Sequence, residues 1–426
     1  RVFFATMASP HFDDIDYTTI PIEHLIRDTE ANSSALPDTS SSFELELASL
    51  TTRVEQYHWI VSWLEKHRLY KTLDSLLEEG SEIASESFNL SKGADQEHSL
   101  EDYAKSEIHS YDLHTGQNVL AVKFHPDSSL DVIASGSTDR TAVISNWKTG
   151  EKLTTIYGAH TAPVLCLDWH PQKEGRLVMG SVDNSASVVD LKGLRGEKDG
   201  ISYEVLARLP IHKKHVVRVA WSPSGTRFAT ASYDHFVKVM EEKDDGEGGV
   251  KYELCKEFEF AEAVESIVWT PDHKWLIVSA RLDNYLHYYD TKTWQETKFN
   301  MNTSQHDDHV SFTAMDLKLS PDGKHLLVST DKNRLIMFAT GTPLQERNFY
   351  DVPNGEWCTP RASFNHTATF VYVSSEDKSV YVYDVASANK RHTLTGHTSN
   401  IRDLSCHPAL DVIATGSFDK SVKIWQ

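Results

Sequence analysis

Short apolar runs alternate with polar turns from residue 117 to residue 426, and one unit recurs along this stretch. Each unit holds an apolar strand that ends at a dipeptide, usually X-Pro, then a second strand, a turn with an aspartate, and a third strand. The turn aspartates are Asp139, Asp183, Asp234, Asp283, Asp331, Asp377 and Asp419. They lie 44, 51, 49, 48, 46 and 42 residues apart, a spacing typical of propeller repeats. The pattern predicts an all-β fold, a seven-bladed β-propeller over residues 107–426.

The strands of these units are apolar at nearly every position, as in the segments 164–169 and 176–181. Such strands must be covered on both faces, which neighbouring blades can do and a lone sheet cannot. The last unit has only three strands before Gln426. Residues 108–113 alternate in polarity ahead of the first unit, and we expect them to supply the fourth strand of blade seven.

The first quarter of the chain has a different pattern. Residues 1–41 are polar and predict a mostly flexible acidic tail, whereas residues 81–106 are rich in Ser, Glu, Asp and Lys and predict a linker. Between them, residues 42–80 predict a helical segment with apolar positions at alternating spacings of four and three. That seam contains Phe43, Leu47, Leu50, Val54, Tyr57, Val61 and Leu64.

The chain is acidic, with a net charge of −20, and residues 1–106 hold 20 Asp/Glu against 8 Lys/Arg. An acidic chain without a basic stripe is repelled by phosphate, so nucleic acid and anionic membrane surfaces are not expected partners. The four cysteines are scattered and form no CxxC pair, which fits a reducing compartment. We expect the protein in the cytoplasm or the nucleus.

Motifs of catalysis and cofactor binding are absent from the sequence: it has no Gly-x-Gly-x-x-Gly, phosphate loop, Gly-x-Ser-x-Gly or His-Glu-x-x-His. The densest histidine cluster, His306-Asp307-Asp308-His309, has the spacing of a solvated loop. We therefore expect no enzyme activity, no cofactor and no metal.

The repeating unit resembles the WD-repeat family, whose units run from a Gly-His pair to a Trp-Asp pair. The fullest matches are Gly396-His397 leading to Ile424-Trp425, and Gly158-Ala159-His160 opening the second unit. The resemblance implies that His397, Asp419 and Trp425 form a hydrogen-bonded network within blade seven. It implies the same for His160 and Asp183, with Val189 where the family has Trp. Blades three to six depart from the pattern, because they lack a clear Gly-His.

Residues 60–79 resemble the lissencephaly-protein homology (LisH) motif, a two-helix hairpin that mediates dimerisation. Ile60, Trp63-Leu64, Thr72, Leu76 and Glu79 fit its spacing, whereas Arg68-Leu69 stand where the family has Gly-Tyr. The resemblance implies a homodimer, and the apolar seam of residues 42–80 also needs a facing helix. The alternative is that this face packs on the propeller of its own chain.

WD-repeat proteins bind other proteins on the narrow face made by the blade-joining loops and the second hairpin turns. The resemblance places candidate partner-binding residues there, namely Tyr233, Leu282, Phe418, His215, Asn400 and Arg402. The expected function is a non-enzymatic scaffold or adaptor. The alternative is a substrate or peptide-motif receptor subunit of a larger complex, such as a ubiquitin ligase or a corepressor.

Overall fold

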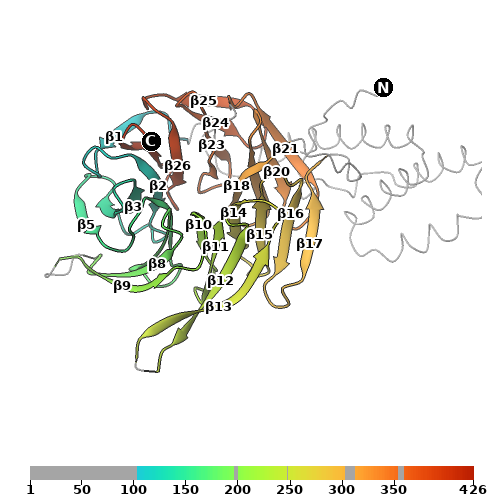
Figure 1. The fold of residues 1–426 in the computed structure, drawn as a ribbon. Helices are drawn as coiled ribbons and strands as arrows, with labels where there is room; N and C mark the ends of the chain where they lie inside the picture. The colour runs from blue at the N-terminus through green and yellow to red at the C-terminus, as the bar shows by residue number, and fades with distance from the viewer. Residues whose placement is uncertain (1–102, 196–199, 247, 303–311, 354–358) are drawn as a thin grey trace, which may run out of the picture. The chain divides into compact units, whose positions relative to one another are not determined.

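A computed structural model describes residues 103–195, 200–246, 248–302, 312–353 and 359–426. Within these residues, twenty-eight strands form seven four-stranded antiparallel sheets arranged as the blades of a propeller (Figure 1). The predicted all-β, seven-bladed fold is confirmed. The predicted tail 1–41, helical segment 42–80 and most of the linker 81–106 lie outside the described residues, as does the cluster 306–309.

The first three blades each run from the innermost strand to the outermost in chain order. Blade one holds β2 (Val119–Phe124), β3 (Val132–Ser137), β4 (Ala142–Asn146) and β5 (Lys152–Ile156). Blade two holds β6 (Val164–Trp169), β7 (Arg176–Ser181), β8 (Ala186–Lys192) and β9 (Ser202–Leu209). Blade three holds β10 (Val216–Trp221), β11 (Arg227–Ser232), β12 (Phe236–Asp244) and β13 (Val250–Glu259).

The next three blades repeat the order. Blade four holds β14 (Val264–Trp269), β15 (Trp275–Ala280), β16 (Tyr285–Asp290) and β17 (Glu296–Asn300). Blade five holds β18 (Ala314–Leu319), β19 (His325–Thr330), β20 (Arg334–Ala339) and β21 (Gln345–Tyr350). Blade six holds β22 (Ala362–Phe364), β23 (Phe370–Ser374), β24 (Val380–Asp384) and β25 (Lys390–Leu394).

Blade seven joins the two ends of the propeller. Its strands are β26 (Ile401–Cys406), β27 (Ile413–Ser417), β28 (Val422–Trp425) and β1 (Glu107–Tyr111), which lies beside the C-terminus in Figure 1. β1 pairs antiparallel with β28, with Glu107 opposite Trp425 and Ser110 opposite Lys423. Lys423, which is 9% exposed, donates to Glu107 Oε2 at 2.7 Å. The strand expected at residues 108–113 thus lies at 107–111.

Each sheet is buried on both faces because neighbouring positions of one strand pack on different blades. Leu177 and Met179 of β7 join the apolar cluster with Ile144 of blade one. Val178, between them, joins the cluster with Phe228 of blade three. Burying a side chain of this size stabilises the fold by about 1.5–3 kcal/mol. The apolar strands of the sequence therefore serve blade-to-blade packing.

The innermost strands are also linked by side chains across blade boundaries. Asp168 of β6 accepts from the backbone N–H of Trp221 at 2.8 Å, and Asp403 of β26 accepts from that of Val122 at 3.0 Å. Ser266 of β14 accepts from Leu317 N–H at 3.1 Å. An unpaired edge N–H in the interior is costly, so these polar groups complete the inner edges of the sheets.

The two outer strands of blade three extend as a hairpin that projects from the ring (Figure 1). The register of β12 and β13 places Asp244 opposite Val250 near the end of this hairpin. Lys243 lies 3.0 Å from Glu253, and Tyr252 donates to Glu242 at 3.0 Å. These cross-strand pairs stabilise a polar hairpin that its composition alone disfavours.

No helix within the described part of the chain is long and apolar enough to span a membrane. Among the same residues, no group of three or more His, Cys, Asp or Glu side chains is placed to hold a metal ion.

Candidate protein-interaction site

The turn of blade seven is held by a chain of four buried side chains. His397 Nδ1 lies 2.7 Å from Asp419 Oδ2, and His397 Nε2 lies 2.7 Å from Thr415 Oγ1. Trp425 Nε1 donates to the same hydroxyl at 2.9 Å. A neutral ring with its proton on Nδ1 donates to Asp419 and accepts from Thr415, so every polar atom of the chain is satisfied. The turn above the innermost strand is therefore rigid.

Three further blades place a loop histidine in the same position. His160 Nδ1 lies 3.1 Å from Asp183 Oδ2, and Ser187 Oγ lies 2.7 Å from His160 Nε2. His114 and His212 contact Asp139 and Asp234 at 2.9 and 3.0 Å, and the sequence analysis did not assign them. Each lies 22–25 residues before its aspartate, the spacing of the assigned pairs, so the spacing could have identified them.

In blades four and six the partner of the aspartate comes from the third strand, four residues after the aspartate. His287 Nε2 lies 2.8 Å from Asp283 Oδ2, and Tyr381 donates to Asp377 at 2.6 Å. In blade five, Asp331 accepts from the backbone N–H of Thr313 at 2.8 Å. The aspartate is thus bound in every blade, although the residue that binds it varies.

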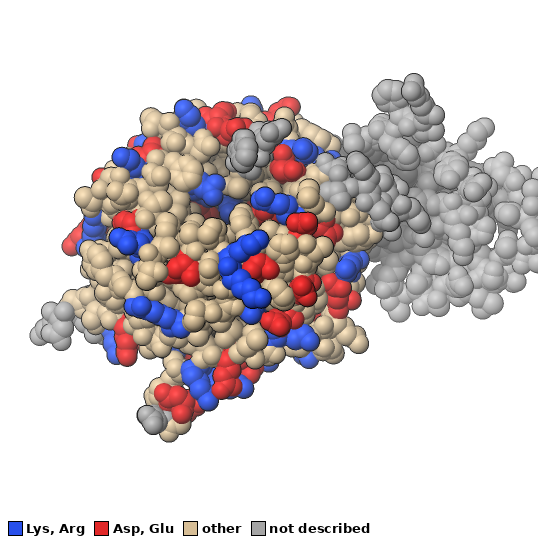
Figure 2. Space-filling view, viewed as in Figure 1, with Lys and Arg blue, Asp and Glu red and all other residues tan. Residues whose placement is uncertain are grey.

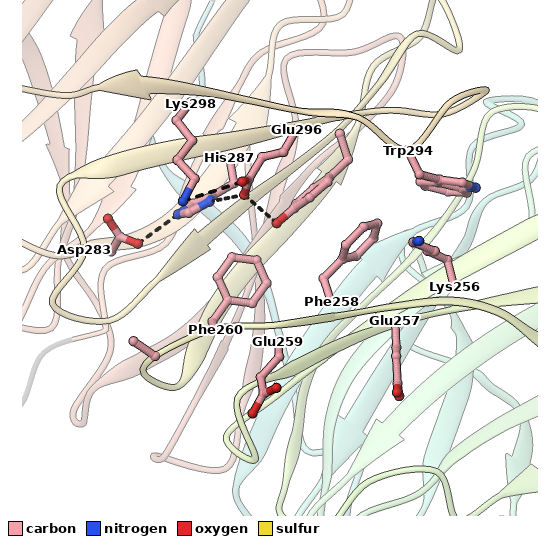
Figure 3. A pocket seen from close by; sticks show the side chains of 12 residues that line it. Lys256, Glu257, Phe258, Glu259, Phe260, Asp283, His287, Trp294, Glu296 and Lys298 are labelled. Carbon is pink, nitrogen blue, oxygen red and sulfur yellow. Dashed lines mark hydrogen bonds and ion pairs between the residues drawn. The ribbon is translucent and has the colours of Figure 1, made fainter.

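The His287 arrangement forms one side of a lateral groove of about 470 Å³ between blades three and four. Figure 3 shows His287 between Asp283 and Glu296, with the rings of Phe258 and Phe260 of blade three on the opposite wall, whereas Trp294 lies on the same blade as His287. His287 Nδ1 lies 2.8 Å from Glu296, and Phe258 stacks on Tyr289 with ring centroids 3.8 Å apart. Asp283, His287, Tyr289 and Glu296 are bonded to one another in this groove, so blade packing accounts for their arrangement.

The rigid turns present side chains around the mouth of the central channel. Tyr233, on the turn of blade three, donates to Glu265 Oε2 at 3.4 Å. Arg281 of blade four donates to Glu265 Oε1 at 2.6 Å, and its guanidinium lies over the Tyr233 ring, 5.5 Å from the centroid. Burial raises the pKa of Tyr233, and the Glu265 carboxylate adds to the effect. These three side chains form one half of the mouth.

Phe418 and Arg402 of blade seven form another part of the mouth. The Arg402 guanidinium lies over the Phe418 ring, 5.1 Å from the centroid, and donates to Thr359 Oγ1 at 2.7 Å. Phe418 is 36% exposed, and its backbone N–H donates to the carbonyl of Asn400 at 3.0 Å. Tyr233 and Phe418 occupy equivalent positions, because the backbone N–H of each donates to the residue just before the innermost strand of its blade, so the two parts lie on the same face of the propeller.

Two other residues predicted to bind a partner, His215 and Leu282, are exposed. His215 is exposed, with its carbonyl accepting from the N–H of Tyr233 and its Nδ1 3.0 Å from the carbonyl of Val182. Leu282 is 62% exposed and lies on a turn where Arg281 makes the backbone bond that Tyr233 makes in blade three. The mouth position of blade four thus belongs to Arg281, and Leu282 lies just outside it.

Below the mouth, the innermost strands place one residue per blade in a common layer, as their cross-strand partners show. Its members are Ala121, Cys166, Arg218, Ser266, Asp316, Arg361 and Asp403. Arg218 donates to Asp316 Oδ1 at 2.7 Å, and Arg361 lies 3.5 Å from the same oxygen. Burial opposes ionisation of Asp316, but Arg218 and Arg361 outweigh it and lower its pKa to about 2.

The propeller surface seen in Figure 2 has Lys and Arg interspersed with Asp and Glu. On that face, therefore, no broad area of one charge stands out. The chemical character of the mouth comes instead from a few aromatic and charged side chains held by the turns.

Comparison with known proteins identifies the repeat. The family model for the WD domain, G-beta repeat (WD40), matches residues 105–144, 150–190, 203–240 and 388–426. The first match includes the closing strand, and the last contains the His397 network.

Similar curated proteins come from several complexes and pathways. The chain is 25% identical over 217 residues to THO complex subunit 3 of Arabidopsis thaliana, covering 50% of this chain and 64% of that protein. It is 27% identical over 337 residues to nuclear distribution protein PAC1 of Coccidioides posadasii (strain C735), covering 74% and 58%. It is 27% identical over 311 residues to the ribosome biogenesis protein WDR12 homolog of Drosophila pseudoobscura pseudoobscura, covering 69% of each.

The chain thus spans less than two thirds of the length of the first two relatives. The four matched segments fall in blades one, two, three and seven, and the other three blades repeat the same strand order. The chain therefore carries WD40 repeats, folded as a seven-bladed β-propeller.

Proposed function

We propose that the protein is a non-enzymatic scaffold that binds a partner protein on the narrow face around the channel mouth. The observation that carries the proposal is the grouping of Tyr233, Phe418 and Arg402 around one mouth, with the exposed Leu282 beside it. Aromatic and arginine side chains are the types that dominate binding energy in protein interfaces. The similar protein of Arabidopsis thaliana is named as a subunit of the THO complex, which supports this role.

The test compares two double variants in quantitative affinity purification. Tyr233→Ala/Leu282→Ala removes one tyrosine and one leucine from the proposed face. Tyr157→Ala/Leu254→Ala removes the same residue types, 65% and 50% exposed, from the outer edges of blades one and three. We expect the first to lose a defined set of partners, by at least about tenfold for two interface anchors, and the second to retain them. Equal retention by both variants would refute the proposed face.

We further propose that residues 42–80 dimerise the chain through the seam Leu47, Leu50, Val54, Tyr57, Val61 and Leu64, and that the protein works in the cytoplasm or nucleus. The support is the apolar seam in the sequence, which needs a facing helix. Light scattering at micromolar concentration should give twice the mass of one chain. A mass of one chain would refute dimerisation. It would favour the alternative, in which the protein is a motif receptor and one subunit of a larger complex.

A further inference from the structure

The central channel is richer in cations than the rest of the protein. Its wall and mouth carry the cations Lys123, Arg218, Lys318, Arg361 and Arg402 against the carboxylates Asp168, Asp316 and Asp403. Glu265 is bound by Arg281 and adds no net charge. The chain as a whole has a net charge of −20, so an excess of positive charge in this one place is distinctive.

The carboxylates of the channel are already engaged. Asp168 lies 3.0 Å from Lys123, and Asp316 serves both Arg218 and Arg361. Asp403 accepts from a backbone N–H of blade one, as described above. Among the described residues, Asp316 Oδ2 is also buried without a hydrogen-bond partner, but the charge of Asp316 is already shared between Arg218 and Arg361.

Two arginines at the mouth retain unused donors. Among the described residues, the Nε atoms of Arg361 and Arg402 are buried and have no hydrogen-bond partner. Arg402 makes its side-chain hydrogen bond to the neutral hydroxyl of Thr359 and lies over the Phe418 ring. Burial of a charged donor without a partner is costly, and a ligand can recover that cost.

The two guanidinium groups also act on each other. Burial and the neighbouring Arg361 charge lower the pKa of Arg402, and burial and Arg218 lower the pKa of Arg361. An anion between them relieves the repulsion and accepts from the unused donors. Arginine suits this task because its planar fork matches both oxygens of a carboxylate or phosphate.

We propose that the channel mouth binds an acidic side chain of the partner, a carboxylate or a phosphate, between Arg361 and Arg402. This inference rests on the proposed partner-binding face, and it names the chemistry that the face recognises. Tyr233 and Phe418 lie at the same mouth, so the apolar residues that flank the acidic group contact these rings. The partner is therefore a peptide segment with an acidic or phosphorylated residue next to apolar ones.

The test uses the full chain and three small probes: N-acetylglutamate amide, N-acetylphosphoserine amide and the uncharged N-acetylglutamine amide. Saturation-transfer NMR titrations at constant ionic strength give the Kd of each probe. We expect saturable binding of at least one anionic probe, and the tighter of the two identifies the source of the anion. Arg361→Gln/Arg402→Gln should weaken that binding at least tenfold.

The matched control is Arg208→Gln, an exposed arginine on β9, the outermost strand of blade two, which removes the same charge far from the channel. It should leave the Kd within about twofold, as expected for a screened surface charge. If the double variant does not fold by circular dichroism, Arg402→Gln alone replaces it, since among the described residues its side chain donates a hydrogen bond only to Thr359.

Equal binding of the glutamine probe, no binding of either anion, or unchanged binding by the arginine variant would each overturn the inference. Its failure is distinguishable from failure of the proposed face, because Tyr233→Ala/Leu282→Ala tests partner binding without changing a charge. If Tyr233→Ala/Leu282→Ala loses its partners and neither anionic probe binds, the proposed partner-binding face is supported and only the anion site is refuted.

Discussion

At the residue scale, the turn aspartates differ in how many donors they accept from. Asp419 accepts from the ring of His397, the backbone N–H groups of Thr398 and Ser421, and the Ser421 hydroxyl. Asp377 of blade six accepts from the backbone N–H of Ser379 and the hydroxyl of Tyr381, and the sequence has no histidine 22–25 residues before it. The same residue type therefore contributes differently to stability in different blades.

Replacing these two aspartates by asparagine tests that difference. Asp419→Asn replaces one acceptor oxygen by an NH₂ group, which then faces the donors that surround Asp419. We expect this change to lower the free energy of unfolding by about 2–4 kcal/mol. Asp377→Asn should cost less than about 1 kcal/mol, since the amide oxygen can still accept from Ser379 and the amide nitrogen can donate to the Tyr381 hydroxyl. Denaturant unfolding of both variants beside the wild type measures the costs, and similar costs would contradict the role assigned to the network.

The buried histidines make stability depend on pH. Burial lowers the pKa of His212 and of His397 below the ordinary value for histidine. As the pH falls below about 6.5, the unfolded chain binds protons at these residues before the folded chain does. The free energy of unfolding should therefore be lower at pH 5.5 than at pH 7.5. In His212→Gln/His397→Gln, the free energy of unfolding should differ less between the two pH values than in the wild type. An unchanged difference would show that other residues cause the pH dependence.

At the element scale, the closing strand depends on the pair between Glu107 and the buried Lys423. Glu107→Lys places two ammonium groups together at this site, and we expect it to lower the free energy of unfolding by about 2 kcal/mol or more. Glu151→Lys, the same change at an exposed position of blade one, is the control and should have little effect. Equal thermal midpoints for the two variants would show that β1 contributes little to closure.

The strand order was predictable because the turn aspartate recurs in all seven units and the X-Pro dipeptide in six of them. The layer of side chains that faces the channel could not be predicted from the sequence. Each innermost strand except β22 has a register shift near its first residue, as between Val216 and Arg218. A shift of one residue changes which side chains face inward. Arg218 and Asp316 therefore show no sequence signal of a channel. The partners of Asp283 and Asp377 in blades four and six were missed because they come from the third strand and not from the blade-joining loop.

At the scale of the whole molecule, bonds between blades couple the ring. Trp169 Nε1 donates to the carbonyl of Lys123 in blade one at 3.3 Å, and Trp269 Nε1 donates to that of Ala220 in blade three at 3.0 Å. Together with the side-chain links between innermost strands, these bonds leave no blade independent among the described residues. A closed ring held in this way should unfold as one cooperative unit.

Substitutions in separate blades test cooperativity. Asp234→Asn in blade three and Asp419→Asn in blade seven should each shift a single denaturant transition, with the slope of free energy against denaturant unchanged. Circular dichroism and tryptophan fluorescence should give coincident curves for both. A second transition in either variant would show that the altered blade unfolds separately.

The pairing of β1 with β28 also sets the timing of folding in the cell. Glu107 and Trp425 are neighbours in the sheet but are 318 positions apart in the chain. At synthesis rates of 5–20 residues per second, the ribosome takes about 15–60 s to cover that distance. During this time β1 has no strand to pair with, and the last blade can form only after Trp425 has been translated. Chaperones that shield strand edges would have their greatest effect on this protein in that interval.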